Sequence, residues 1–366
     1  MNRRDFLSGI AGSLPVLQVG IHSRSAWAAQ SATAAGWRRF ELVTRVDVAE
    51  PSGRTHLWLP VPWRQRTDYQ HSLGSKWDAP GVARARIVTV AGYDVRLLHV
   101  EWPDAKSVGP VTLTAHVATR DRRVDPAAAT GALRESEDTL REYLRATALL
   151  PTDGIVRETV VRITRGLAGA IEKARAIYEW IVDNTTRDAK TPGCGIGDAG
   201  SMLSSGHLGG KCADINGLFV AMARAVRIPA RDAYGVRVAD SRRGFNCLGK
   251  SGDISKAQHC RAEFYAQGHG WIPVDPADVR KVMLEEVPGG LPMSDPKVQM
   301  ARAMLFGEWE MNWVAYNHGH DVALPGSSRG SIPFLMYPNG ETAERRLNSL
   351  DATTFRYSMS AREVTA

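Results

Sequence analysis

Three residues in the second half of the chain have the types and the order of a thiol nucleophile, its base and an acid that orients the base. Cys212 follows Gly210 and Lys211 where a helical pattern begins, and His259 and Asp275 follow on two strand-like segments. A thiolate attacks acyl carbon atoms, an imidazole takes and returns the proton, and a carboxylate holds the imidazole in one tautomer. The order of these residues predicts cysteine-based acyl chemistry.

The candidate nucleophile is expected at the first position of a helix, or beside it. An apolar face with helical spacing follows it and ends before Pro229, formed by Ile215, Leu218, Phe219, Met222 and Val226. A helix N-terminus carries unpaired N–H groups and partial positive charge, which favour a thiolate and can hold an oxyanion. The alternative for Cys212 is a small cysteine packed in the core.

The candidate base lies on a segment whose two faces differ in polarity. The polar face carries His259, Arg261, Glu263 and Tyr265, and the other face carries Cys260, Ala262 and Phe264. This alternation makes Cys260 a packing residue and puts His259 on the face where a base lining a cleft is needed. The alternative is a surface histidine on a half-exposed strand.

The candidate acid lies on the next alternating segment, residues 270–276. If residues 265–269 connect the two strands of a hairpin, His259 and Asp275 are directly opposite each other, close enough for the carboxylate to hold the imidazole. A connection with an even number of residues would set Cys260 opposite Asp275, unless a bulge restored the pair. The alternative for Asp275 is an acid that caps a turn.

The first residues have the features of an export signal. Arg3 and Arg4 precede a moderately apolar, glycine-interrupted stretch at residues 6–21, and a small-residue cleavage pattern follows. A paired arginine before a weakly hydrophobic stretch indicates the twin-arginine route, although an ordinary secretory signal would give the same address. We therefore expect residues 1–28 to be removed and the protein to be periplasmic or extracellular.

The composition is that of a globular protein. Of the 366 residues, 43% are hydrophobic and 23% are charged, and no apolar run is long enough to predict a membrane span. The formal net charge is +7, but the basic residues are scattered, so nucleic-acid binding gains no support. No cofactor is expected, and the oligomeric state is left open.

Cysteine and histidine spacing gives no metal site. If Cys212 stays free to react, at most one disulfide can form among Cys194, Cys247 and Cys260, and the sequence does not choose the pair. The nearest approach to a metal cluster is His318, His320 and Asp321, for which a polar loop or strand end is the favoured interpretation.

The region before the candidate nucleophile divides into β structure and helices. Residues 36–120 are predicted to form an antiparallel β-sandwich-like domain, because short alternating segments are separated by turns. These segments are residues 40–48, 56–61, 84–90, 94–100 and 111–117. Residues 120–131 are predicted to be a linker.

Helices follow the predicted linker. Thr152 and Asp153 are candidates to cap one helix, and helical spacing predicts another over residues 171–181. The Gly- and Ser-rich residues 194–210 predict a loop that leads to the candidate nucleophile. Residues 286–366 are expected to complete a sheet or cover the core, with strand-like runs at 332–337 and 355–364.

At this point the chain resembles the bacterial transglutaminase-like superfamily. The runs GKCADINGLFVAMARAVRIPAR, residues 210–231, and HCRAEFYAQGHGWIPVDPAD, residues 259–278, are similar to its two signature segments. The resemblance covers residues 135–285 and implies an α+β fold with a papain-like catalytic core. It maps the nucleophile, base and acid onto Cys212, His259 and Asp275. Many members have an aromatic residue two positions after the histidine, where this chain has Arg261.

The resemblance implies acyl transfer through a thioester, with a peptide or protein substrate. Hydrolysis of a peptide or amide bond is favoured, because no dedicated amine site is visible in the sequence. Crosslinking by transfer to an amine is the alternative, and a non-catalytic binding or scaffold module is a third possibility. The expected exported location makes a cell-wall peptide one candidate substrate.

Overall fold

The computed structural model describes residues 36–364, except 82, 91, 130, 132 and 133. The predicted export signal, residues 1–28, lies outside the described residues. None of the helices in the described ranges has both the length and the apolar character needed to cross a membrane. The described residues fall within one compact unit.

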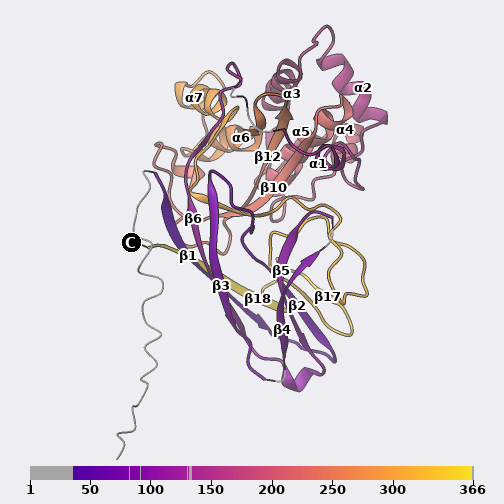
Figure 1. The fold of residues 1–366 in the computed structure, drawn as a ribbon, viewed down its shortest axis with the longest axis vertical. Helices are drawn as coiled ribbons and strands as arrows, with labels where there is room; N and C mark the ends of the chain where they lie inside the picture. Colours follow the sequence, from indigo (N-terminus) through magenta and orange to yellow (C-terminus); the bar gives the residue numbers. More distant parts are fainter. Residues whose placement is uncertain (1–35, 82, 91, 130, 132–133, 365–366) are drawn as a thin grey trace, which may run out of the picture. The chain divides into compact units, whose positions relative to one another are not determined.

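Two five-stranded antiparallel sheets form a sandwich, and β1, β3, β6 and β18 of the first sheet run alongside one another in Figure 1. The first sheet has the order β11 (Gly252–Asp253), β18 (Phe355–Glu363), β1 (Arg38–Val48), β6 (Val111–Thr119) and β3 (Gln70–Asp78). The second has the order β17 (Arg346–Leu347), β16 (Asn339–Glu341), β2 (Thr55–Pro60), β5 (Val95–Trp102) and β4 (Arg84–Val90).

Strand alternation explains why the two sheets face each other. In β1 the side chains at every second position from Phe40 to Val48 are buried, as a strand with one covered face requires. Apolar residues of both sheets share one cluster, which includes Val46 of β1, Leu57 of β2, Leu98 of β5 and Leu113 of β6. A β-sandwich is therefore present, but four of its strands, β11, β16, β17 and β18, lie outside the predicted residues 36–120.

A smaller, four-stranded antiparallel sheet carries the candidate base. Its order is β13 (Gly270–Val274), β12 (Gln258–Ala266), β10 (Ala230–Arg237) and β15 (Trp313–Asn317). The helices are α1 (Glu137–Glu142), α2 (Gly154–Ile163), α3 (Ala170–Asn184), α4 (Ala199–Ser205), α5 (Cys212–Ala225), α6 (Pro276–Glu285) and α7 (Pro296–Met304). The shorter elements are η1 (Ala105–Ser107), β7 (Arg122–Arg123), β8 (Thr186–Arg187), β9 (Gly209–Gly210), η2 (Asn246–Leu248) and β14 (Glu308–Trp309).

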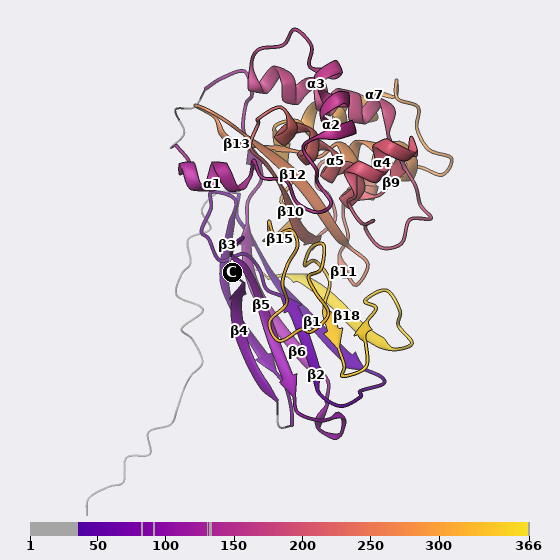
Figure 2. The ribbon, with the colours of Figure 1, turned by 90° about the vertical axis from the view of Figure 1, so that its right-hand side faces the viewer.

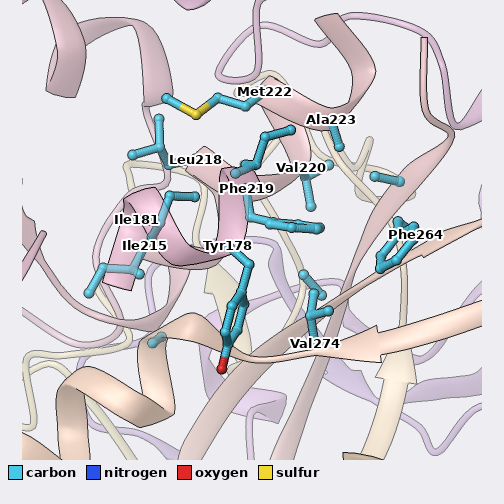
Figure 3. Close-up of a cluster of buried hydrophobic side chains, with 14 of the residues drawn as sticks. Tyr178, Ile181, Ile215, Leu218, Phe219, Val220, Met222, Ala223, Phe264 and Val274 are labelled. Atoms are coloured by element: carbon cyan, nitrogen blue, oxygen red, sulfur yellow. The ribbon is translucent and has the colours of Figure 1, made fainter. Parts of the chain in front are cut away.

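Helix α5 packs against β10 and β12 (Figure 2). Its apolar side chains explain this packing. All of its residues are buried, so it is a core helix rather than a surface helix. Figure 3 shows Phe219 of α5 and Tyr178 of α3 in one cluster with Phe264 of β12 and Val274 of β13. The helical core and the sheet are thus one packed body, which agrees with the predicted α+β class.

Some predicted segments have a different structure. The Gly- and Ser-rich stretch contains α4, because the Asp198 side chain caps its first turn and Gly206 ends it with a positive φ of 70°. The predicted strand at residues 332–337 is reduced to one bridge between Ile332 and Val322, because Pro333 has no N–H to continue a ladder. The edge strand β3 lacks an apolar alternation and was not predicted.

Segments on both sides of the helical region join other parts of the fold. Strand β18 pairs with β1, so the end of the chain contributes a strand to the first sheet. The predicted linker contains β7, which pairs with β14, and the side chain of Arg122 in β7 is buried. The division at residues 36–120, 135–285 and 286–366 stays a prediction.

Candidate active site

Cys212 is the first residue of α5, as the helical phase predicted, with Lys211 as the N-cap residue. Its side chain is only 3% exposed. The first N–H groups of a helix have no acceptor within the helix, so they are available to a charge that develops beside the sulfur. The position therefore suits both a thiolate and a bound oxyanion.

The carboxylate of Asp214 fixes the approach to this helix. It accepts hydrogen bonds from the backbone N–H groups of Lys211 at 2.9 Å, Ile196 at 3.0 Å and Gly197 at 2.9 Å. A Cβ atom at Gly210 would lie 2.6 Å from the Asp214 carboxylate, too close for any real contact. The glycine before the cysteine is therefore needed so that the preceding segment can pack onto the first turn of α5.

The structure brings the base and the acid together. His259 Nε2 lies 2.8 Å from Asp275 Oδ2, and the Trp313 indole N–H donates to the His259 carbonyl at 2.8 Å. Because Nε2 is engaged by the acid, Nδ1 is the ring nitrogen left to face another partner. The histidine interacts electrostatically with Cys212, so the three predicted residues share one site.

The predicted hairpin register is wrong by two residues. The ladder pairs Ala266 with Gly270 and Ala262 with Val274, so the connection is residues 267–269 and His259 is not directly opposite Asp275. A shift of two positions keeps each side chain on its original face, whereas a shift of one would have separated the pair. The acid therefore meets the histidine diagonally, from the residue that follows β13.

Asp275 also acts as a capping acid, the alternative considered for it, because it is the N-cap residue of α6. Its Oδ1 accepts from the Asp278 N–H at 3.1 Å and from Asn216 Nδ2 at 3.1 Å. Asn216, one turn after Cys212, also donates to the Cys260 carbonyl at 2.9 Å. A single buried amide thus joins the helix of the nucleophile to the strand of the base and to the acid.

Asp278 is a site residue that was not predicted. Its Oδ1 lies 3.3 Å from His259 Nε2 and accepts from Arg237 Nη2 at 2.6 Å. Burial alone would raise the pKa of Asp278, but Arg237 and His259 hold it well below its usual value. The available signal was its spacing, since the third residue after a helix N-cap returns to the same end of the helix.

Neighbouring thiols favour the ionised form of the candidate nucleophile. The Cys194 and Cys260 thiols interact with the Cys212 sulfur and lower the pKa of Cys212 well below its usual value. Burial opposes this shift, and the hydrogen bond and charge of His259 add to it. Cys260 therefore both packs in the core, as predicted, and stabilises the sulfur of Cys212.

Carboxylates favour the protonated form of the base. Burial and Arg237 lower the pKa of His259, but Asp278, Asp275 and the hydrogen bond to Asp275 outweigh them and raise it to about 10. Together with the lowered pKa of Cys212, this favours a thiolate and an imidazolium as the resting pair.

Replacing Asp278 tests this balance of charges. Asp278→Asn removes a negative charge beside the imidazolium, so the pKa of His259 should fall by about one unit or more. Anionic iodoacetate reacts faster beside the imidazolium charge, so the alkaline limb of its rate with Cys212 should move to lower pH by the same amount. Asp104→Asn, at an exposed residue of the sandwich, is the control and should leave the profile unchanged. An unmoved alkaline limb in Asp278→Asn would show that Asp278 does not act on His259.

One group of potential metal ligands coincides with this site. Ligand atoms of His259, Asp275 and Asp278 lie within 4.8 Å of one another. Arg237 bonds Asp278 at 2.6 Å, and Arg261 Nε lies 3.6 Å from Asp275. Because these guanidinium groups already balance both carboxylates, the donor set fits a charged hydrogen-bond network better than a metal ion.

His318 and His320, the other candidates for a metal site, form hydrogen bonds within the protein. His318 and His320 follow β15, at the strand end that the sequence indicated. His318 Nδ1 lies 2.7 Å from the Asp232 carbonyl, and His320 Nε2 lies 2.9 Å from Asp232 Oδ2. Both are buried, so they hold the end of β15 against β10.

Arg261 occupies the position where many relatives have an aromatic residue. Its side chain is 2% exposed and donates from Nη1 to the Glu310 carbonyl at 3.0 Å. Its guanidinium lies over the ring of Trp313, 4.9 Å from the ring centre. The departure therefore changes the support behind Asp275 and not the wall that a substrate would touch.

A cavity of about 870 Å³ lies beside Cys212 and His259. The end of the chain forms part of its wall, with Tyr337, Leu350 and Tyr357 among the lining residues. No chemistry was expected of this region from the sequence, because its aromatic and apolar residues are typical of ordinary packing. These residues lie beside Cys212 because of the tertiary fold, which the sequence pattern does not show.

All four cysteines are free. The Cys194 thiol donates to the Gln258 carbonyl at 3.3 Å, and Cys194 and Cys247 line the same cavity as Cys212. The thiol pKa is raised well above its usual value in Cys194, Cys247 and Cys260. Cys212 is the cysteine whose surroundings favour the thiolate.

The chain is similar in sequence to known proteins. Residues 157–276 match the sequence profile of the Transglutaminase-like superfamily. A Haemophilus influenzae protein described as uncharacterized is 34% identical over 336 residues, which cover 87% of this chain and 89% of that protein.

The chain also resembles solved structures, and a structure with a TM-score above 0.5 shows a similar fold. The crystal structure of a candidate cysteine protease from Cytophaga hutchinsonii has a TM-score of 0.54 at 16% identity, with 91% of this chain and 92% of that chain covered. The periplasmic domain of TgpA from Pseudomonas aeruginosa has a TM-score of 0.35 at 15% identity, with 70% and 93% covered. From the matched profile and the arrangement of its elements, the chain belongs to the transglutaminase-like superfamily.

Proposed function

We propose that the protein is a cysteine-dependent peptidase or amidase that acts through a thioester on Cys212. The strongest support is the arrangement of three buried residues. Cys212 is 3% exposed at the start of α5, it interacts with His259, and His259 Nε2 lies 2.8 Å from the buried carboxylate of Asp275. His259 serves as acid and base, and Asp275 orients it. The adjoining cavity, at about 870 Å³, has room for a peptide segment.

The reaction begins with attack of the Cys212 thiolate on the substrate carbonyl carbon. The electron pair of the carbonyl moves to its oxygen, which the N–H groups at the start of α5 stabilise. The C–N bond then breaks, and the His259 imidazolium gives its proton to the leaving amine. The products of this half-reaction are the free amine, a Cys212 thioester and a neutral imidazole.

The second half-reaction restores the enzyme. Neutral His259 takes a proton from water as the water oxygen attacks the thioester carbon, and the C–S bond breaks. The carboxylic acid leaves, and the thiolate and imidazolium are restored. If an amine attacks in place of water, the product is a new amide, which is the crosslinking alternative. A retired scaffold is less well supported, because all the groups that the chemistry needs are present and paired.

The product formed from peptides distinguishes these outcomes. The protein is incubated with a peptide library and a tagged primary amine, with Cys212→Ala as the blank, and products are separated by mass spectrometry. Hydrolysis predicts shortened peptides that carry new carboxyl ends. Incorporation of the tag without cleavage would replace hydrolysis by crosslinking, and no Cys212-dependent product from either reaction would favour the scaffold.

We also propose export by the twin-arginine route, supported by Arg3 and Arg4 before the apolar stretch. Replacing both with lysine should leave the full-length precursor in the cytoplasmic fraction. Processing that is unaffected by this change, but blocked by loss of the general secretory route, would instead assign an ordinary secretory signal.

A further inference from the structure

Basic side chains dominate the charged lining of the cavity beside Cys212. Among the described residues that line it, one acidic side chain, Asp253, accompanies six basic ones: Arg187, Lys211, Arg237, Lys250, Lys256 and Lys281. This imbalance is local, because the whole chain carries 46 Lys and Arg residues against 39 Asp and Glu residues. The cavity is therefore more basic than the protein as a whole.

Three of the basic groups pair with two acids outside the lining. Arg237 pairs with Asp278 at 2.6 Å. Arg187 pairs with Glu285 at 2.5 Å, and Lys281 pairs with the same carboxylate. Two carboxylates offset most of the charge of these three groups, so the larger part of the imbalance comes from the remaining lysines.

Lys211, Lys250 and Lys256 make no ion pair within 4.0 Å in the part of the chain that the structure describes. The nearby Asp253 is exposed, and its Oδ1 already accepts from the Ser255 N–H at 2.9 Å and the Ser255 hydroxyl at 2.6 Å. One partly engaged carboxylate, which interacts electrostatically with Lys250 and Lys256, therefore accompanies three ammonium groups in the lining. The lining keeps a positive charge that a ligand can meet.

The position of this charge relates it to catalysis. Lys211 is the residue before Cys212, and the start of α5 adds partial positive charge at the same place. Lys250 and Lys256 lie on the segment that leads into β12, which carries His259. Tyr337, Leu350 and Tyr357 line the cavity as well, and they offer apolar surface to a peptide backbone.

We propose that the substrate is an acidic peptide, with carboxylate side chains or a free carboxyl end near the bond that is attacked. The carboxylates would pair with Lys250, Lys256 and Lys211 while the acyl carbon meets the Cys212 sulfur. The proposal rests on the proposed function, since it names the substrate class of that site. Pairing at this half-exposed surface should be sensitive to salt.

The first test needs no substrate. Cys212 is alkylated at low salt with iodoacetate, which is anionic, and with iodoacetamide, which is neutral and of similar size. The quantity measured is the iodoacetate rate divided by the iodoacetamide rate. Lys250→Gln/Lys256→Gln should lower this ratio by about threefold or more, and added salt should reduce the difference. Lys106→Gln, outside the cavity, is the control and should keep the wild-type ratio. An unchanged ratio in the double variant would overturn the proposal.

The second test separates binding from turnover. Matched fluorescent peptides that contain Glu or Gln are titrated into Cys212→Ala, and into the same variant with both lysines replaced. Cys212→Ala should bind the Glu peptide at least about threefold more tightly than the Gln peptide. Replacing both lysines should abolish this preference. Equal or tighter binding of the Gln peptide would overturn the acidic-substrate proposal even if peptides are cleaved. Preference for Glu without any turnover by the wild type would overturn the proposed function alone.

Discussion

Cys212→Ala should abolish peptide turnover, with a loss of about four orders of magnitude or more. The same variant should take up no electrophilic label at neutral pH, whereas the wild type should take up one equivalent. The physical reason is that the surroundings lower the pKa of Cys212 and raise the pKa of the other three thiols. Labelling stoichiometry by intact-mass spectrometry, together with peptide turnover, gives both measurements.

Cys247→Ala is the matched control. Cys247 lines the same cavity and is partly exposed, but burial raises its pKa, so it should not compete for the label. This variant should keep one equivalent of label and most of the turnover. If Cys212→Ala kept either the label or the turnover, Cys212 would not be the nucleophile.

The sequence was sufficient where local periodicity decides the structure. Helical spacing from Ile215 to Val226 predicted that Cys212 begins a helix, and it is the first residue of α5. Alternation separated His259 from Cys260, because neighbouring strand residues point to opposite faces. These predictions depend on residues within one or two turns or one strand, so they needed no knowledge of the rest of the fold.

Other parts of the site depend on contacts that are distant in the sequence. The hairpin register depends on how far the ladder continues toward its turn, and both three- and five-residue connections leave His259 and Asp275 on the same side. Arg237 is 41 residues before Asp278 in the sequence, although its side chain donates a hydrogen bond to the Asp278 carboxylate. The wall that includes Tyr337 comes from a segment whose sequence shows only apolar packing. No local pattern gives such contacts.

The polar face of β12 shows the same limit. It was expected to line a cleft or meet solvent, yet Arg261 and Glu263 are buried as completely as the residues on the apolar face. Arg122 of β7 bonds Glu263 on this face, and the ring of Trp309 in β14 lies against Arg261. Charged side chains on this strand therefore had to find partners inside the protein, which alternation alone cannot reveal.

Glu263→Gln should reduce the free energy of unfolding by about 3–5 kcal/mol, the usual cost of breaking a buried ion pair. Glu263 is fully buried and accepts hydrogen bonds from Arg231 Nε at 2.6 Å and from Arg122 Nη1. A neutral amide leaves two buried guanidinium groups without a countercharge. Denaturant unfolding measures the loss, and Asp47→Asn, which removes a half-exposed pair with Arg356, should change stability by less than about 1 kcal/mol.

The same carboxylate predicts the acid limit of stability. Burial would raise the pKa of Glu263, but Arg122 and Arg231 outweigh it and lower the pKa to about 2. Because the folded pKa is below the unfolded one, this stabilisation is full above the unfolded value and is lost as pH falls toward about 2. The difference between wild type and Glu263→Gln should therefore shrink in acid.

A constant difference at all pH values would mean that Glu263 acts through packing and not through its charge. Arg122 belongs to β7, in the segment first interpreted as a linker, and it also donates to the Trp271 carbonyl of β13 at 2.5 Å. The charge of Glu263 therefore ties that segment to the hairpin that positions His259 and Asp275. Loss of this charge should also lower the rate at which Cys212 is alkylated, whereas Asp47→Asn should not.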